Sequence, residues 1–334
     1  MSVYETALAG LPAVTLEDER LRVTVLAGKG TDVVELTDKR RELDLTWRSP
    51  TGIRNPAAIS AGAGADDVAA FLDTYPGGWQ EVLPNGGAPS VYRGATLPQH
   101  GEVATVPWTY EVIDEHAVRF TVTTRRLPLR LLKVLRLRDG GLEIDEEVAN
   151  EALVPLEVMW GHHITFGEPF LRPGATIRLP ERVMVIPHPA AIHPSGQRRV
   201  APGGPYRWPV VPGTDLDTVD LSVVPEPGTP SDIVYLTGFG DIGWYEVADP
   251  RSGAGLRVEW DATVLPYLWL WQEFGTTTDY PWWGRAYVIG LEPFSSYPTD
   301  GLAAAVANGT ALRLPAGGRR RLRLWARLLE EEEV

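Results

Sequence analysis

The sequence predicts an all-β protein, on three observations. Apolar and polar residues alternate over residues 118–124, 142–148 and 321–324, which is the period of strands with one buried face. The 34 glycines and 29 prolines are scattered along the chain, and both residue types interrupt long helices. A helical pattern covers only residues 66–72, enough for one or two turns. We therefore expect sheets with very little helix.

Turn signals separate the predicted strands. Asp139-Gly140-Gly141 lies between residues 130–138 and the alternating residues 142–148 and predicts a hairpin, because glycine supplies the positive φ of a tight turn. Gly317-Gly318 precedes the last alternating segment in the same way. Residues 187–230 are the least regular part of the chain and are rich in proline. A loop of that length is usually functional or carries short elements of its own.

The length favours a single large domain over residues 1–334. A chain of 334 residues with 44% hydrophobic content can bury a large core, and β-sandwiches often exceed the usual domain size. No internal repeat and no low-complexity linker divides it. We expect the acidic end, residues 330–334, to form a solvated tail.

Composition excludes several classes of protein. Because the chain has no cysteine, it has no disulfide, no thiolate zinc site and no thiol nucleophile. Its net charge of −13 argues against nucleic-acid binding, which needs a basic surface. No leader of basic then apolar residues opens the chain, and no apolar run approaches the roughly 20 residues of a bilayer span. We expect a cytoplasmic protein, monomeric or homodimeric, with no membrane partner.

Three segments place histidine or glutamate in apolar surroundings. They are Leu97-Pro98-Gln99-His100-Gly101-Glu102-Val103, Met159-Trp160-Gly161-His162-His163-Ile164-Thr165-Phe166 and Val288-Ile289-Gly290-Leu291-Glu292-Pro293. A carboxylate and an imidazole that face each other across a polar substrate can remove one proton and deliver another, with no metal and no cofactor. Glu292 ends a strongly apolar strand, and poor solvation there raises the pKa of a carboxyl group toward neutrality.

The adjacent pair His162-His163 has a geometric consequence. Successive side chains of a strand point to opposite faces, so only one of the two rings can face a given site. Neighbouring strand histidines cannot easily bind one ion, and their spacing is not that of a helical zinc motif. The pair therefore predicts one ring in the site and no metal centre.

In this order the three segments resemble the motifs LPxHG, HxYF and IEP of the aldose 1-epimerase (galactose mutarotase-like) family, over roughly residues 20–328. The resemblance implies a large antiparallel β-supersandwich with a sugar cleft on one sheet. It also implies that Glu292 is the general base and that His100 binds a sugar hydroxyl. Phe166 follows His163 by three residues, as an aromatic follows the acid histidine in the family, so His163 is the predicted acid and His162 its neighbour in the substrate-binding set.

Further predicted substrate contacts come from the surrounding segments. Residues 76–87 resemble the glycine-rich entry to the family's cleft, which places Trp79 and Asn85 beside the sugar. Trp271 belongs to a cluster of tryptophans that suits either the apolar face of a sugar or the core. Arg93 is the nearest basic residue before His100.

Two further observations concern the charge of the substrate and the aspartate that would bind it. Val103 stands where sugar-phosphate members of this superfamily carry a basic residue, which favours an uncharged sugar, although Arg93 or Arg198-Arg199 could reverse that preference. Asp232 and Asp241 are alternative candidates for the family's sugar-binding aspartate.

The function implied by the resemblance is interconversion of the α and β anomers of a free aldose or related sugar by acid–base ring opening. Two alternatives remain: a carbohydrate-binding protein without turnover, and a supersandwich lyase or hydrolase that acts on a glycan. A glycoside hydrolase needs two carboxyl groups roughly 5–10 Å apart, and only Glu292 is evident in the sequence.

Overall fold

The computed structural model describes residues 2–59, 68–192, 196–215 and 217–334, and they fold into two large antiparallel sheets. In spatial order the 12-stranded sheet contains β1 (Ser2–Leu8), β2 (Leu11–Glu17), β3 (Leu21–Leu26), β4 (Asp32–Asp38), β6 (Trp79–Val82), β14 (Gly161–Gly167), β24 (Tyr287–Phe294), β23 (Tyr267–Phe274), β20 (Asp232–Thr237), β16 (Met184–Pro187) and β17 (Tyr206–Arg207), with β5 (Leu43–Asp44) paired to β4.

The 8-stranded sheet contains, in spatial order, β15 (Thr176–Arg178), β21 (Ile242–Asp249), β22 (Ala254–Asp261), β26 (Arg319–Leu328), β12 (Gly141–Asn150), β11 (Leu129–Arg138), β10 (Ala117–Thr123) and β9 (Thr109–Asp114). Three strand pairs lie outside the large sheets: β7 (Ser90–Tyr92) with β8 (Ala95–Leu97), β13 (Leu156–Val158) with β25 (Leu312–Leu314), and β18 (Val210–Pro212) with β19 (Thr218–Asp220). The helices are α1 (Pro56–Ile59), α2 (Ala69–Leu72), α3 (Leu302–Ala307) and the 3₁₀ turn η1 (Glu331–Glu333).

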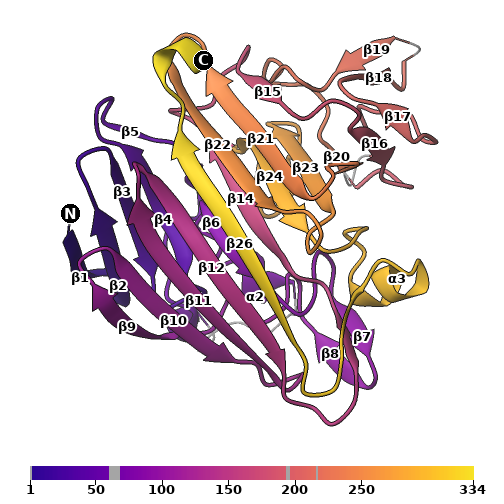
Figure 1. The fold of residues 1–334 in the computed structure, drawn as a ribbon. Coiled ribbons are helices and arrows are strands. Elements are labelled where there is room, and N and C mark those ends of the chain that lie inside the picture. The colour runs from indigo at the N-terminus through magenta and orange to yellow at the C-terminus, as the bar shows by residue number, and fades with distance from the viewer. Residues whose placement is uncertain (1, 60–67, 193–195, 216) are drawn as a thin grey trace.

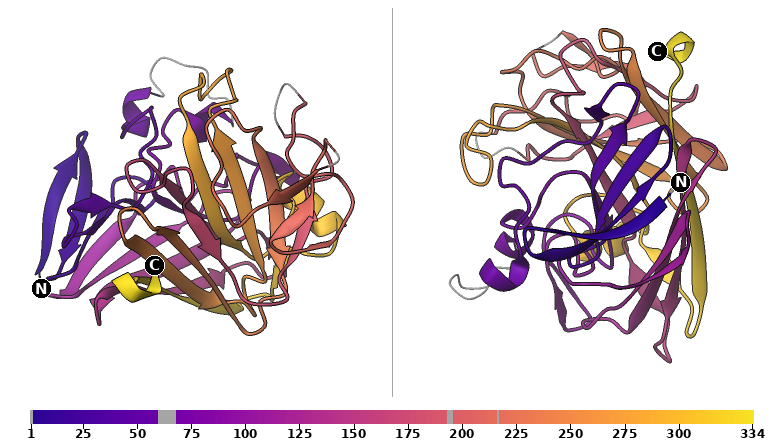
Figure 2. Two further views of the ribbon diagram at one scale, coloured as in Figure 1. Left: turned by 90° about the horizontal axis from the view of Figure 1, so that it is seen from above. Right: turned by 90° about the vertical axis from the view of Figure 1, so that its left-hand side faces the viewer.

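The two large sheets face each other as layers (Figures 1 and 2) and enclose one main hydrophobic core. Alternation along each strand builds this core, because every second residue points inward. In β11 the buried positions are Leu129, Leu131, Lys133, Leu135 and Leu137. The predicted sandwich is confirmed, and Lys133 is an ionic exception in an otherwise apolar row.

The hairpin predicted between residues 130–138 and 142–148 joins β11 to β12. Its turn residues Asp139 and Gly140 have φ values of 49° and 72°, which is the conformation that favours glycine and tolerates aspartate. Of the predicted helical segment, α2 covers Ala69–Leu72, and Asp66 and Asp67 lie outside the described residues. The irregular region predicted over residues 187–230 carries the short strands β17, β18 and β19.

In the acidic end, Glu331 and Glu332 are exposed, while Glu330 and Glu333 form ion pairs with the rest of the protein. Glu333 accepts two hydrogen bonds from the guanidinium of Arg327, each 2.8 Å long, and Glu330 forms an ion pair with Arg20 at 2.6 Å. The end of the chain therefore contacts both large sheets, because Arg327 belongs to β26 and Arg20 lies in the turn between β2 and β3. Among the described residues, none of the helices has the length and apolarity needed to cross a bilayer.

Candidate active site

Cross-strand register sets the site on the larger sheet. Trp269 lies directly opposite Glu292 on the neighbouring strand, and Trp271 lies opposite Gly290. Thr165 of β14 is also opposite Gly290. Because directly opposite residues share a face, His163, two residues before Thr165, lies on the same face as Glu292. The neighbouring residues of β14 point the other way, toward the smaller sheet.

A cavity of about 540 Å³ lies over this face, which is a usual size for a small-molecule site. Glu292 and His163 line it, and His100 reaches it from the loop after β8. Two bonds hold His100 to Gly87: the Gly87 N–H donates to His100 Nδ1 at 3.3 Å, and the His100 N–H donates to the Gly87 carbonyl at 3.0 Å. Nδ1 is thus an acceptor, so neutral His100 carries its proton on Nε2.

The central pair is Glu292 and His163, with Oε1 and Nε2 3.6 Å apart. Burial raises the pKa of Glu292 well above its ordinary value. Burial also lowers the pKa of His163 well below its ordinary value, helped by the charge of protonated His100. Both shifts disfavour the charged forms. Both shifts thus favour the state in which Glu292 is protonated and His163 is neutral, with one exchangeable proton on the pair.

Gly290 makes room for the carboxylate. A Cβ at this position would lie 2.2 Å from Glu292 Oε1, well inside van der Waals contact. Any side chain there would displace the carboxylate from its place opposite His163. A glycine inside a strand often marks such a close approach.

A hydrogen-bond chain assigns the protons of His163. The Thr165 hydroxyl donates to the Gly78 carbonyl at 2.9 Å, so it accepts from the Tyr75 hydroxyl at 3.2 Å. The proton of Tyr75 is thereby used, and its oxygen is free to accept from His163 Nδ1 at 3.3 Å. His163 accordingly carries one proton on Nδ1, and Nε2 is the atom that gains or loses a proton beside Glu292.

Aromatic rings form the remaining walls. Trp271 lies 5.8 Å from His163 and 5.9 Å from Trp282 between ring centroids, and Phe71 lies 4.6 Å from His100. Such walls suit the apolar C–H face of a sugar ring, while polar groups bind its rim. In the described part of the chain, no lysine or arginine lines the cavity.

Four predicted site residues meet in this cavity: Glu292, His163, His100 and Trp271. Trp79 and His162 do not. Both are buried on the opposite face of the sheet, where the Trp79 indole N–H donates to His162 Nδ1 at 2.9 Å. Trp79 therefore belongs to the core and cannot stack on a ligand in the cavity. The orientation of His162 follows from strand alternation: because His163 faces the cavity, the ring of His162 points toward the smaller sheet.

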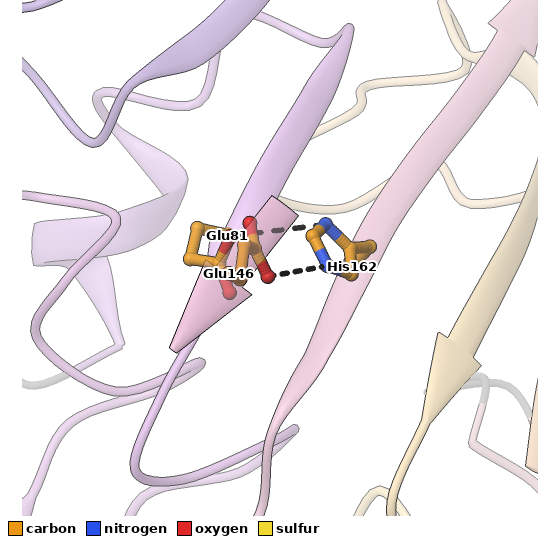
Figure 3. A group of neighbouring side chains, drawn as sticks. All are labelled: Glu81, Glu146 and His162. Carbon is orange, nitrogen blue, oxygen red and sulfur yellow. Dashed lines mark hydrogen bonds and ion pairs between the residues drawn. The ribbon is translucent and has the colours of Figure 1, made fainter. Parts of the chain in front are cut away.

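His162 belongs to a buried ionic cluster between the two sheets (Figure 3). Its Nε2 lies 3.1 Å from Glu146 of β12, and Glu81 of β6 lies beside both. Lys133 donates to Glu81 at 3.0 Å and lies 3.5 Å from Glu146. Two carboxylates and a histidine could ligate a metal, but the ammonium group already supplies the compensating cation. We assign the cluster a structural role.

Asn85 and Arg93, both predicted to contact substrate, lie outside the cavity lining. Asn85 is fully buried; it donates to the carbonyls of Ala88 and Pro98 and accepts from the Leu302 N–H. It thus joins three loops. Arg93 donates at the surface to the Pro155 carbonyl at 2.9 Å.

The two aspartates predicted as alternative sugar contacts also lie outside the cavity lining. Asp232 accepts the backbone N–H groups of Arg199 and Val200. Asp241 is exposed next to β21 of the smaller sheet. Neither carboxylate is placed to bind a ligand in the cavity.

Other residues of the site were not predicted from the sequence: Tyr75, Gly290, His188 and Asp300. Gly290 carried a usable signal, since it interrupts a strongly apolar strand. The other three lie in irregular segments, and only the tertiary structure brings them to the cavity.

Comparison with solved structures places the fold. The chain is similar to a candidate aldose 1-epimerase from Klebsiella pneumoniae subsp. pneumoniae, with a TM-score of 0.73 and 18% identity, covering 97% of this chain and 82% of that one. It is similar to a candidate aldose 1-epimerase from Escherichia coli K12, with a TM-score of 0.66 and 13% identity, covering 98% and 100%. It is also similar to a galactose mutarotase-like protein from Clostridium acetobutylicum, with a TM-score of 0.65 and 12% identity, covering 98% of each chain.

These likenesses confirm the galactose mutarotase-like sandwich predicted from the three motifs. No curated protein matches the chain. A family model matches residues 8–194 and 213–328, so the chain belongs to the family described as a domain of unknown function, DUF4432.

Proposed function

We propose that this protein interconverts the α and β anomers of an uncharged aldose or a closely related sugar. The observation that carries the proposal is the pairing of Glu292 Oε1 with His163 Nε2 at 3.6 Å on the floor of an aromatic cavity. Both groups line the cavity, and the directions of their pKa shifts favour a state with one exchangeable proton on the pair. That is the arrangement that concerted removal and delivery of a proton requires.

In the proposed reaction Glu292 removes the proton of the anomeric hydroxyl while His163 Nε2 protonates the ring oxygen. The bond between the anomeric carbon and the ring oxygen breaks, and the open-chain aldehyde forms. Rotation about the adjacent carbon–carbon bond then exposes the other face of the carbonyl. Closure reverses both transfers: His163 takes the proton of the attacking hydroxyl, and Glu292 returns its own to the carbonyl oxygen. The protonation state of the pair is restored.

His100 would hold the substrate during these steps. Its Nδ1 is engaged by Gly87, so Nε2–H is the group left to donate. Burial lowers the pKa of His100 to about 4, so it acts as a neutral donor near neutral pH. A neutral donor fits a sugar hydroxyl and adds no charge beside His163.

The test is the anomer exchange rate of freshly dissolved D-galactose and D-glucose, measured by NMR magnetisation transfer. We expect Glu292→Gln and His163→Asn each to lower the enzyme-dependent rate by about 10²-fold or more, because each removes one positioned proton transfer. Glu115→Gln and His116→Asn make the same changes in an exposed turn and should keep the wild-type rate.

Binding and hydrolysis assays separate the alternatives. Quenching of tryptophan fluorescence reports ligand entry, because Trp271 and Trp282 line the cavity. Sugar binding without faster anomer exchange would indicate a carbohydrate-binding protein. Release of reducing sugar from aryl glycosides would indicate a hydrolase, and its loss in Asp300→Asn would identify Asp300, which also lines the cavity, as the second carboxylate.

A further inference from the structure

The cavity contains a second polar pair, formed by His188 and Asp300, which the reaction above does not use. His188 directly follows β16, and Asp300 precedes α3. Their Nε2 and Oδ1 atoms lie 3.7 Å apart, and both residues line the cavity. The His188 side chain is 5% exposed, whereas that of Asp300 is 52% exposed. The pair therefore combines a buried imidazole with an accessible carboxylate.

Hydrogen bonds orient the imidazole. The Thr299 N–H donates to the Tyr235 hydroxyl oxygen at 2.9 Å, and that hydroxyl lies 2.7 Å from His188 Nδ1. Tyr235 already accepts from Thr299, and burial raises its pKa well above the ordinary value, so it stays protonated and donates to Nδ1. Neutral His188 then carries its proton on Nε2, on the side of Asp300. The donor N–H of His188 and the acceptor carboxylate of Asp300 therefore lie next to each other.

The position of Asp300 is also fixed by the backbone. It forms an isolated antiparallel bridge with Gly87, the residue that holds His100. A Cβ at Gly87 would lie 1.9 Å from the Thr299 carbonyl oxygen, so only glycine permits this approach. The contact between Gly87 and Asp300 thus fixes the position of Asp300 relative to His100.

Sheet register separates the pair from the reacting groups. Glu292 lies opposite Trp269, and Trp269 lies opposite Tyr235, so Tyr235 is two strands away from the carboxylate, about 10 Å between backbones. A sugar ring whose anomeric carbon lies at Glu292 would extend along this row toward His188. Its hydroxyls at the remote end would be the groups within reach.

We propose that His188 and Asp300 form a specificity subsite that hydrogen-bonds hydroxyls of the sugar remote from the anomeric carbon. This rests on the proposed function for the orientation of the sugar. His188 Nε2–H donates to one hydroxyl oxygen, and the Asp300 carboxylate accepts from that hydroxyl or its neighbour. A phosphate or carboxylate at this end of the sugar is excluded by repulsion from Asp300.

The two nearby arginines are hydrogen-bonded to other groups and not to Asp300. The Arg198 guanidinium donates to the carbonyls of Val200 and His188, and that of Arg199 donates to Gln272 Oε1 at 2.5 Å. Neither residue lines the cavity. The subsite therefore selects neutral sugars over their acidic or phosphorylated derivatives.

The experiment compares Asp300→Asn with the matched control Asp139→Asn, which removes an exposed carboxylate in the β11–β12 turn. Dissociation constants for D-galactose, D-glucose, their 3-deoxy and 4-deoxy derivatives and their 6-phosphates are measured by tryptophan fluorescence. We expect Asp300→Asn to weaken binding of one parent sugar about tenfold, the usual size for a lost charge-assisted hydrogen bond. Binding of the deoxy sugar that lacks the contacted hydroxyl should be the same in both variants.

Several results would overturn the subsite. They are equal binding of every sugar by the Asp300 and Asp139 variants, no binding of either parent sugar by the wild type, and tighter binding of the 6-phosphates than of the parent sugars. Kinetics distinguish this failure from that of the proposed function. If the wild type binds sugar in an Asp300-dependent way but does not accelerate anomer exchange, the subsite stands and the catalytic proposal fails. In an active enzyme, Asp300→Asn should raise KM and leave kcat near wild type.

Discussion

At the scale of single residues, the central feature of the site is the protonation of the pair Glu292 and His163. Glu292 and His163 are both buried, and the pKa shift of each disfavours its charged form. Both shifts favour the neutral tautomer, with the proton on Glu292, and in the proposed reaction the ion-pair tautomer is the form that would open a sugar ring. Proton exchange between the two facing atoms connects these forms without any change in net charge.

Tyr75 is a positioning residue for His163 and can be tested as one. Tyr75→Phe removes the acceptor of the Nδ1–H group, and an acceptor stabilises the protonated ring. We expect kcat to fall about tenfold and the acid limb of the pH–rate profile to move to lower pH. Tyr110→Phe, on β9 of the smaller sheet, is the control. An unchanged profile in Tyr75→Phe would show that its hydroxyl does not set the protonation of His163.

Gly290 can be tested by adding one methyl group. In Gly290→Ala the new Cβ meets Glu292 Oε1, so the carboxylate must turn away from His163. We expect kcat to fall about 10²-fold with little change in the dissociation constant for sugar. Thermal unfolding of the variant checks that the fold is retained. Wild-type turnover in a folded Gly290→Ala protein would contradict the assigned carboxylate position.

At the scale of elements, alternation explains most of what could be predicted. It identified the strands around the β11–β12 hairpin and required His162 and His163 to face opposite ways. Alternation could not show that Trp79 of β6 faces the core, because all four residues of this central strand are buried and both of its faces are covered. Nor could it detect that Asn85 connects its own loop to the segments at Pro98 and Leu302, since the contact with Leu302 spans more than two hundred residues of sequence.

Asn85 provides a prediction at this scale. Asn85→Ala would leave the buried Leu302 N–H without its acceptor. It would also remove the side-chain donor to the Ala88 and Pro98 carbonyls, although the Pro98 carbonyl still accepts from the Gly101 N–H. Each unsatisfied buried group costs about 1–3 kcal/mol, so we expect a clear loss in the free energy of unfolding in urea. Asn308→Ala, which removes exposed hydrogen bonds to the Tyr297 carbonyl and from Thr310, should cost much less, because water can replace them. Equal losses in both variants would refute the loop-joining role.

At the scale of the whole molecule, the buried cluster between the sheets should make stability depend on pH. Burial and the charge of Glu146 raise the pKa of Glu81 to about 7. A folded pKa above the unfolded value means that the native state binds this proton more tightly. The stability that protonated Glu81 contributes is therefore fully present below pH 4.5 and is lost as the pH rises through about 7.

The Glu81 prediction is checked with the isosteric Glu81→Gln variant. Urea unfolding of wild type and variant is compared from about pH 4.5 to 8, and the difference between them isolates Glu81 from the other titrating groups. We expect the stability of wild type relative to the variant to fall across that range. Glu115→Gln, in an exposed turn, should show no such trend. A pH-independent difference between wild type and Glu81→Gln would contradict the prediction.

Strand period predicted an all-β protein, and the resemblance of the three motifs to a known family predicted the specific sandwich. The structure brings Glu292, His163 and His100, one from each motif, to one cavity. The cavity walls were not predictable in the same way. His188 and Asp300 are more than one hundred residues apart in sequence and meet only because β16 and the segment before α3 reach the same end of the larger sheet.

The most direct test of the account is the pH–rate profile of anomer exchange with the wild-type protein. Exchange should require exactly one proton on the Glu292–His163 pair, so the rate should form a plateau across neutral pH. The acid limb should lie below the ordinary histidine pKa of 6.5, because that of His163 is lowered, and the basic limb should follow loss of the last proton from the pair. No acceleration at any pH, or an acid limb above 6.5, would contradict the account.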